Sequence, residues 1–361
     1  MTSTPNATGA KPSIWFRAGR WSSQIRRPLW QQRLKHSDLP ILVGPWRGEV
    51  ALEAIYWIPW VQRLRQELGI DPTRLIPIGR GGSAWWYQVP TGIELYVLRT
   101  PQQVRIETKL QHQAKHQLKQ IAWTPFERAV VQDAADSINA KRYLTLHPHR
   151  MCDEIAPFWE GQRGLAWLQR QLAFAPLTLP PLPATAHLPD QFVAVHFYAR
   201  STWPMAPPLI QFATETIKQL SHAQPVVLVG SGLHMDDHMD LPIPPLPNVY
   251  TLKDCGVDVT PQTNLALVSA VLGKAAGCLG TYGGTVQLAA RLGKPAIGFY
   301  DQWQGTMVAH KHLSEALAMQ LGVQFLVLKL GDIPLMQAAL PRVMLQGPKP
   351  GLDIPVLTGV A

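Results

Sequence analysis

Short apolar runs alternate with longer stretches in which apolar residues recur at helical spacing, and this alternation continues along most of the chain. Runs such as PILVGPW and FVAVHFY have the length and composition of buried strands, whereas VALEAIYWIPWVQRLRQELG has the periodicity of a helix. Strands that alternate with helices of about 10–15 residues are typical of βαβ units with a parallel sheet. The pattern therefore predicts an α/β protein.

The predicted elements fall into two blocks. Strands of the first block are expected at 40–46, 74–82, 94–98 and 142–148, and helices at 50–69, 102–123, 126–140 and 154–174. Strands of the second block are expected at 192–198, 225–230, 248–252, 277–282, 295–300 and 323–330, and helices at 209–223, 262–275, 283–293 and 308–322. Pro59 is expected to kink or break the first helix, because proline lacks the backbone N–H that an interior turn requires.

The segment APLTLPPLPATAHLPD separates the blocks, and its five prolines favour a stiff, extended linker. A length of 361 residues also fits two domains. We therefore expect two Rossmann-like parallel-sheet domains that face each other across a cleft. The predicted boundaries are an N-terminal arm at 1–39, a first domain at 40–174, the linker at 175–190, a second domain at 191–345 and a tail at 346–361.

Composition narrows the class of protein. Hydrophobic residues make up 46% and charged residues 16%, which argues against global disorder. No apolar run reaches the roughly 18–20 residues of a membrane span, and the N-terminus lacks the apolar core of a signal peptide. The three cysteines, Cys152, Cys255 and Cys278, have no metal-type spacing, so a reduced, cytoplasmic location is expected.

Most of the net charge of +9 lies in the N-terminal arm, where seven basic residues, one acid and several interleaved aromatics give +6. Such a segment suits peripheral contact with anionic lipid at the inner face of a membrane, or contact with nucleic acid. A solvated arm that packs a few aromatics on the protein explains the same pattern. Nucleic acid is the less favoured partner.

Ligands of open parallel sheets bind beyond the carboxyl ends of the strands, so the loops after the strands supply the candidate site residues. The strongest candidate is the turn GTYGGT, which joins a predicted strand to a predicted helix. Its glycines allow close backbone approach, and the N–H groups and dipole of the helix start favour a diphosphate. The spacing is neither a dinucleotide fingerprint nor a P-loop, and a turn that only permits tight packing is the alternative. The ligand-binding candidates here are Thr281, Gly283, Gly284 and Thr285.

Other strand ends of the second block add three candidates. Arg200 can form a forked contact with phosphate oxygens, and His196 lies near the end of the same strand. Gly230 ends the strand PVVLVG. For His196, the alternative is a half-buried histidine that only packs.

In the first block, Glu49 follows the opening strand, where it either stabilises a helix start or acts as a general base. Arg47 and Arg80 are candidates for binding phosphate or an acceptor, or are surface charges. The loop from His234 to Asp240 is rich in histidine and aspartate, but its spacing matches no metal signature. We therefore expect no metal and no cofactor.

The segment NLALVSAVLGKAAGCLGTYGGTVQLAARLGKPAIGFY resembles the donor side of GT-B class glycosyltransferases of the bacterial heptosyltransferase-like and fucosyltransferase-like groups. GPWRGEVALEAIYWIPW is similar to an acceptor-side loop and helix of bacterial polysaccharide enzymes. The resemblance implies that Gly283, Gly284 and Thr285 bind the donor diphosphate and that Arg200 contacts phosphate or sugar. The chain departs from the fucosyltransferase-like H-x-R spacing, because His196 and Arg200 lie further apart, and it lacks E-x-x-E and D-x-D motifs.

The resemblance implies an enzyme that transfers a sugar from a nucleotide-diphospho-sugar to a hydroxyl of a glycan, lipid-linked or protein acceptor, without a metal. Glu49 and His196 are the candidate catalytic residues, and domain closure is expected to exclude water. A nucleotide-sugar epimerase on the same frame remains an alternative, and so does a non-catalytic protein that binds nucleic acid or a membrane.

Overall fold

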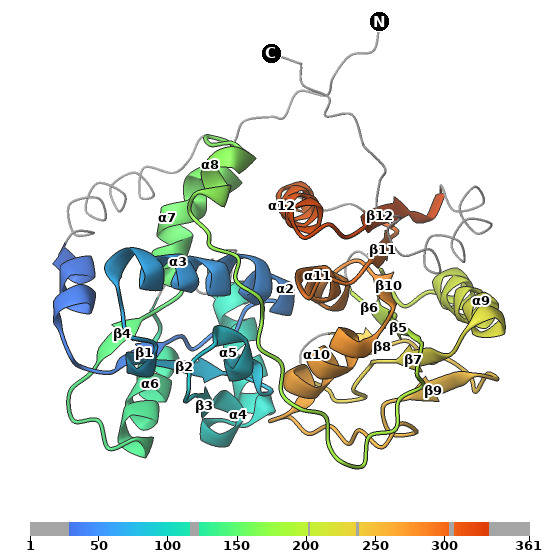
Figure 1. The fold of residues 1–361 in the computed structure, drawn as a ribbon, viewed down its shortest axis with the longest axis horizontal. Helices are drawn as coiled ribbons and strands as arrows, with labels where there is room; N and C mark the ends of the chain where they lie inside the picture. The colour runs from blue at the N-terminus through green and yellow to red at the C-terminus, as the bar shows by residue number, and fades with distance from the viewer. Residues whose placement is uncertain (1–28, 116–122, 201–202, 236–237, 303–306, 332–361) are drawn as a thin grey trace, which may run out of the picture.

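The computed structural model describes residues 29–115, 123–200, 203–235, 238–302 and 307–331. Two parallel β-sheets lie on opposite sides of a layer of helices, one sheet in each half of the chain (Figure 1). Both are parallel throughout, as the alternation of strands and helices predicted, so the α/β class is confirmed.

The first sheet has the order β3-β2-β1-β4. Its central strand β1 (Ile41–Val43) is fully buried and pairs with β2 (Leu75–Gly79) and β4 (Leu144–Leu146), with Ile41 opposite both Leu75 and Leu144. The edge strand is β3 (Ile93–Glu94). The longer helices of this half are α3 (Ile58–Leu68), α5 (Pro101–Lys115), α6 (Pro125–Ser137) and α7 (His149–Trp159). Shorter helical segments are α2 (Val50–Leu52), η1 (Glu53–Trp57), η2 (Pro72–Arg74), η3 (Ser83–Tyr87), α4 (Leu95–Leu98) and α8 (Leu165–Gln169).

The second sheet has six strands in the order β12-β11-β10-β5-β7-β9. Counted from the first strand of this half, the order is that of a doubly wound dinucleotide-type sheet, which reverses direction between its first and fourth strands. Those strands are β5 (Val193–His196) and β10 (Gly277–Thr281). The others are β7 (Val226–Leu228), β9 (Val249–Thr251), β11 (Ala296–Tyr300) and β12 (Phe325–Lys329), and the helices are α9 (Pro207–Ala223), α10 (Asn264–Lys274), α11 (Gly284–Arg291) and α12 (Met307–Gln320). A short antiparallel pair, β6 (Tyr198–Ala199) with β8 (Met239–Asp240), lies beside this sheet.

The helix through Pro59 continues, so the break that the sequence offered as one of two outcomes does not occur. A π-helical segment, η1, precedes the proline, and the amide of Ile58 bonds to the carbonyl of Glu53. This wider turn leaves the Ala54 carbonyl without its usual partner within the helix. Nε of Arg291, on α11 of the other half, donates to that carbonyl over 3.3 Å.

The predicted strand ELYVL was also wrong beyond its first residue, because α4 starts at Leu95. Glu94 caps this helix through the amide of Tyr96 and also accepts from the amides of Gly81 and Gly82. One carboxylate thus holds the end of β3, the start of α4 and the loop after β2.

Three other predicted regions differ in detail. The long helix at 102–123 is described up to Lys115, and residues 116–122 lie outside the described part. The helix at 154–174 is two helices, α7 and α8, and Gly161 between them has a φ of 71°. The linker at 175–190 has no helix or strand, and its leucines pack on the core. Of the arm at 1–39, residues 1–28 lie outside the described residues, as does all of the tail at 346–361.

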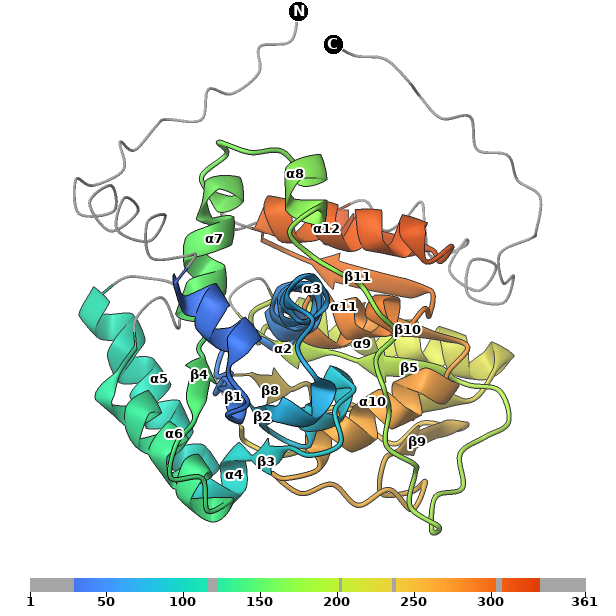
Figure 2. The same ribbon diagram turned by 60° about the vertical axis from the view of Figure 1, so that its left-hand side comes forward.

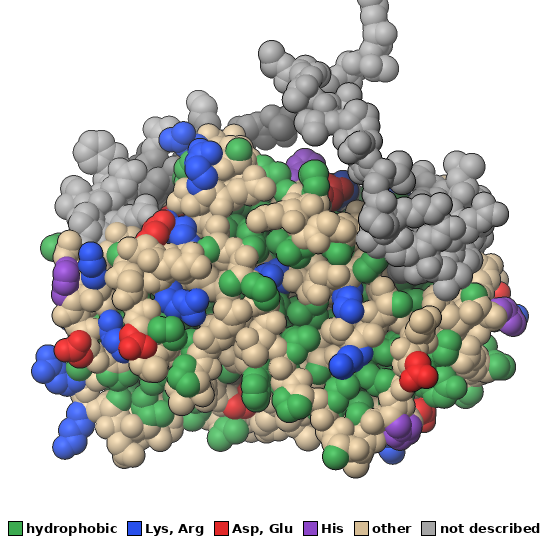
Figure 3. Space-filling model, viewed as in Figure 1, with side chains coloured by type: hydrophobic (Ala, Val, Ile, Leu, Met, Phe, Trp, Pro, Cys, Tyr) green, Lys and Arg blue, Asp and Glu red, His purple; other side chains and the backbone are tan. Residues whose placement is uncertain are grey.

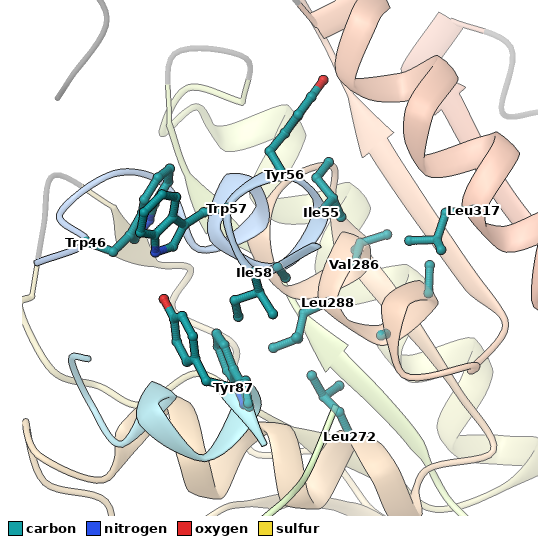
Figure 4. Close-up of a cluster of buried hydrophobic side chains, with 14 of the residues drawn as sticks. Trp46, Ile55, Tyr56, Trp57, Ile58, Tyr87, Leu272, Val286, Leu288 and Leu317 are labelled. Carbon is teal, nitrogen blue, oxygen red and sulfur yellow. The ribbon is translucent and has the colours of Figure 1, made fainter. Parts of the chain in front are cut away.

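The two halves share one hydrophobic core. Ile55, Trp57 and Ile58 of the first half pack in the same cluster as Val286 and Leu288 of α11 (Figure 4). α2 and η1 contact α11 along this interface, and the turned view shows the same helices lying together (Figure 2). Because large apolar interfaces resist relative domain motion, this arrangement argues against the closing motion expected from the sequence.

Candidate functional site

A pocket that is open to solvent lies between the two halves at the carboxyl ends of β5 and β10. This is the point at which the strand order of the second sheet reverses, where doubly wound sheets bind ligands. Its polar lining comes from both halves and comprises Glu49, His196, Tyr198, Ser231, His238, Asp240, Asn264, Gly284 and Thr285.

The turn into α11 faces this pocket through Gly284 and Thr285. A Cβ on Gly283 would lie 2.1 Å from the Tyr198 hydroxyl and 2.5 Å from Nη1 of Arg200, so a larger residue there would displace the ends of both side chains. The Gly284 amide donates to the Tyr198 hydroxyl over 3.2 Å. The start of the helix is therefore covered by one hydroxyl and one guanidinium, both of which suit a phosphate.

Arg200 is held in its charged form. Burial alone would lower the pKa of Arg200, but its interactions with Tyr198 and Glu49 raise that pKa above its ordinary value. Nη1 of Arg200 donates to the Tyr282 carbonyl over 3.4 Å, and Nε has no hydrogen-bond partner. A permanently charged guanidinium beside a glycine turn is well suited to a diphosphate.

Thr281 and Gly230 do not line the pocket, but each contacts or leaves room for a residue that does. The buried Thr281 hydroxyl bonds to both the amide and the carbonyl of Tyr198, each at 3.0 Å, and so fixes that residue. A Cβ on Gly230 would lie 2.7 Å from Oδ2 of Asp240, so glycine leaves room for that carboxylate. The structure thus gives both residues an indirect place in the site.

His196 is the centre of a polar chain. Its Nδ1 lies 2.7 Å from the Thr285 hydroxyl and its Nε2 lies 2.8 Å from Oδ1 of Asp240. Oδ2 of Asp240 accepts from the Gly232 amide over 2.9 Å. The imidazole therefore has a polar partner at each nitrogen, and it does more than pack.

Glu49 enters the pocket from the first half, and its backbone is firmly held. Its carbonyl accepts from Nε1 of Trp46 and from the Glu53 amide, each at 3.1 Å. Its side chain does not cap the helix that follows. Glu49 and Arg200 both act on His310 of α12, whose pKa falls to about 4 because burial and Arg200 outweigh Glu49. The neutral His310 ring contacts the Tyr56 hydroxyl over 2.9 Å.

Arg47 and Arg80 do not line the pocket, in contrast to the ligand-binding role that the sequence suggested. Arg47 is buried, where its Nη2 pairs with Glu127 at 2.9 Å and its Nη1 donates to Thr108. Arg80 is buried too, and it donates to the Gly48 carbonyl and lies 4.0 Å from Glu53. Arg80 therefore supports the loop that carries Glu49.

Replacing Arg47 by methionine should lower the free energy of unfolding by about 3–5 kcal/mol, because it leaves a buried carboxylate without its charge partner. Burial alone would raise the pKa of Glu127, but the hydrogen bond from His147 and the charge of Arg47 lower it to about 2. A lowered folded-state pKa stabilises the fold above the ordinary value of 4.5, and this contribution is lost as the pH falls towards 2. Urea denaturation between pH 7 and pH 2 measures both effects.

The matched control is Arg128→Met, one residue from Glu127 but exposed. A surface change of this kind should alter stability by no more than about 0.5 kcal/mol. Equal stability of the two variants would contradict a structural role for the Arg47 pair.

The loop from His234 to Asp240 contributes His238 and Asp240 to the pocket, while Asp236 and Asp237 lie outside the described residues. The His238 ring lies 4.9 Å from the Tyr198 ring. Within the described part of the chain, no group of three or more histidine, cysteine or acidic side chains is placed to hold a metal ion.

The structure thus gathers Glu49, His196, Gly284 and Thr285 around one pocket; Arg200 and Gly283 do not line it but lie next to Tyr198, which does. Sequence reasoning missed Tyr198 and His310. Tyr198 ends a strand-like apolar run and so suggested core packing, whereas His310 begins the helix after β11 and could have been found as a strand-end residue.

Comparison with known proteins gives matches among solved structures only; no family model matches the chain, and no curated protein sequence matches it. The chain is similar to the E. coli heptosyltransferase WaaC with ADP, at 14% identity over 81% of this chain and 93% of that chain, with a TM-score of 0.41. It is similar to a family 9 glycosyl transferase from Veillonella parvula DSM 2008, at 11% identity over 86% and 91%, with a TM-score of 0.44. A third is the spinosyn rhamnosyltransferase SpnG, at 11% identity over 85% and 100%, with a TM-score of 0.33. Among the described residues, none of the helices is both long and apolar enough to cross a membrane.

Proposed function

We propose that this chain is a glycosyltransferase that moves a sugar from a nucleotide-diphospho-sugar to a hydroxyl acceptor. One observation carries the proposal: the pocket at the reversal point of the second sheet is lined by the helix start at Gly284 and Thr285 and by Glu49 from the opposite half, and the charged Arg200 lies against the adjoining Gly283. A diphosphate donor and a hydroxyl acceptor need these two kinds of group on opposite sides of one pocket.

The donor diphosphate lies against the turn into α11 in this proposal. Arg200, the amides at Gly283 and Gly284, and the hydroxyls of Tyr198 and Thr285 are the groups that neutralise it. Negative charge grows on the diphosphate as the sugar leaves, and preorganised donors stabilise that charge most in the transition state. With these groups in place, the reaction we propose uses neither a metal nor a cofactor.

Glu49 is the proposed general base, and it takes the proton from the acceptor hydroxyl as the sugar is transferred. It comes from the half that does not hold the donor, and its backbone is fixed by Trp46, Glu53 and the Arg80 contact with Gly48. His196, also proposed as catalytic from the sequence, acts on the donor side through Thr285. We place the reaction in the cytoplasm, in the synthesis of a polysaccharide or glycoconjugate, with contact to a membrane surface through the N-terminal arm.

A thermal-shift screen against GDP-, UDP-, ADP-, dTDP- and CMP-linked sugars tests the proposal. A donor at about 100 times its dissociation constant should stabilise the fold by about 2.7 kcal/mol. The sugar nucleotide that binds is then incubated with and without candidate hydroxyl acceptors. Conversion of the sugar without any acceptor would indicate the epimerase instead, and the absence of a shift with every member of the panel would contradict donor binding.

A non-catalytic role in binding nucleic acid or a membrane finds no separate support in the described residues. On the face shown in Figure 3, Lys and Arg side chains are interspersed with Asp and Glu and separated by hydrophobic and other side chains. Most of the basic excess of the chain lies in residues 1–39, and residues 1–28 are outside the described part.

A further inference from the structure

While His196 is neutral, Asp240 determines the direction of each hydrogen bond in the series Thr285–His196–Asp240. The Asp240 carboxylate only accepts, so at 2.8 Å the proton between it and Nε2 belongs to His196. In the neutral ring Nδ1 then carries a lone pair, and it accepts the proton of the Thr285 hydroxyl over 2.7 Å. Thr285 lines the pocket, and in this state its oxygen can only accept there.

A phosphate oxygen is also only a hydrogen-bond acceptor. While His196 is neutral, the phosphate oxygen and the Thr285 oxygen would face each other as two acceptors and repel. A second proton on His196 reverses the arrangement. Nδ1–H then donates to Thr285, and the threonine hydroxyl turns its own proton towards the pocket. Asp240 supports this state, because a carboxylate beside imidazolium stabilises the positive charge.

We infer that binding of a phosphate-type anion at the start of α11 is coupled to uptake of one proton by His196, and that Asp240 is the positioning residue that supports it. The inference rests on the anion site of the proposed function and specifies how that site is regulated by pH. An anion that binds the protonated form of the protein more tightly has an affinity that rises as the pH falls, because binding and proton uptake are thermodynamically linked. The comparison is therefore made between pH 6 and pH 8, within the range in which histidine side chains serve as pH switches.

Several other charged or titratable groups face this histidine or its pocket. Tyr198 of β6 lies with its ring centroid 4.8 Å from the His196 ring, and the ring of His238, which precedes β8, is tilted against the Tyr198 ring at 4.9 Å. Glu49 enters from α2, and Arg200 lies over Gly283. Of these, His238 is the one whose protonation would mimic the proposed effect, so the experiment must separate it from His196.

Inorganic sulfate is a suitable probe, because it mimics phosphate and does not itself take up protons in this range. Its affinity for the full chain is measured by isothermal titration calorimetry at pH 6 and pH 8, with ionic strength held constant by chloride. Coupling to one proton changes affinity by up to tenfold per pH unit, and we expect sulfate to bind about tenfold more tightly at pH 6.

Variants show which histidine causes the pH dependence of sulfate affinity. His196→Gln should bind sulfate with the same affinity at both pH values, and Asp240→Asn should reduce the difference to about twofold. His238→Gln, and His187→Gln at an exposed site elsewhere, should keep the wild-type difference. Sulfate affinity that is equal at both pH values in the wild type, or a difference that survives His196→Gln, would overturn the inference, as would failure of sulfate to bind.

Sulfate is not a sugar donor, so this result is independent of the nucleotide-sugar screen. If no nucleotide sugar binds while sulfate still shows the His196-dependent effect, the proposed function fails and the proton coupling stands. If a nucleotide sugar binds while sulfate binding ignores pH, only the coupling is wrong.

Discussion

Gly283→Val should abolish binding of the nucleotide-sugar donor and leave the fold intact. The backbone of Gly283 has a φ of 166°, which any residue adopts, so the effect comes from space and not from strain. The new side chain would start 2.1 Å from the Tyr198 hydroxyl and 2.5 Å from Nη1 of Arg200. It would displace both groups from the start of α11, and these are groups that the proposed function assigns to the diphosphate.

We expect donor affinity to fall by more than about 100-fold, which corresponds to about 2.7 kcal/mol. Calorimetric titration with the nucleotide sugar identified in the screen measures it, and circular dichroism checks the fold. Gly164→Val is the matched control, since a Cβ at Gly164 meets nothing within 4 Å and α8 is far from the pocket in sequence and contacts. Unchanged donor affinity in Gly283→Val would remove this turn from the site.

The repeating pattern of strands and helices could be predicted from the sequence because βαβ units leave a strong periodic signal. Two departures from this prediction arise from specific hydrogen bonds that the spacing of apolar residues does not reveal. The segment after β3 becomes helical because Glu94 also accepts from Gly81 and Gly82, which lie in another loop. The helix survives Pro59 because a π turn shifts its hydrogen bonds and Arg291 satisfies the carbonyl that is released.

The shared core was not foreseeable in the same way. EAIYWIPW has the composition of an ordinary core helix, and nothing in its spacing shows that Ile55 points towards Val286 of the other half of the chain (Figure 4). Which helix of the other half this segment packs against is determined by the tertiary fold and cannot be predicted from a short stretch of sequence. The expectation of a hinge followed from treating the two blocks as separate domains.

The site shows the same division. The order of the elements predicts that Gly283, Gly284, Thr285 and His196 lie at strand ends, and His196, Gly284 and Thr285 line the pocket found there. The side chains that contact these residues come from neighbouring elements, and their identity cannot be predicted from the order of the elements. Tyr198 is turned towards the glycine turn by Thr281, and Asp240 reaches His196 through the short pair β6–β8. Arg47 illustrates the opposite error, since a strand-end arginine proved to be a buried partner of Glu127.

Glu49→Gln should lower the rate of sugar transfer at saturating donor by about 10²–10⁴-fold, the usual contribution of a general base. The substitution keeps the shape of the side chain and removes its ability to accept a proton. It leaves α2 intact, because the Glu49 side chain makes no capping hydrogen bond there. It also removes a negative charge that acts on Arg200, so donor affinity should stay the same or increase.

A lower transfer rate with unchanged or higher donor affinity distinguishes a catalytic role from a structural one. Replacing a residue that only stabilises the fold would lower donor affinity and stability together. Initial rates of transfer and donor titrations, measured on the same preparation, give the two quantities. Glu215→Gln, at an exposed position of α9, is the control for loss of one carboxylate and should leave both unchanged. A Glu49→Gln enzyme that transfers sugar at the wild-type rate would show that the proton leaves the acceptor by another route.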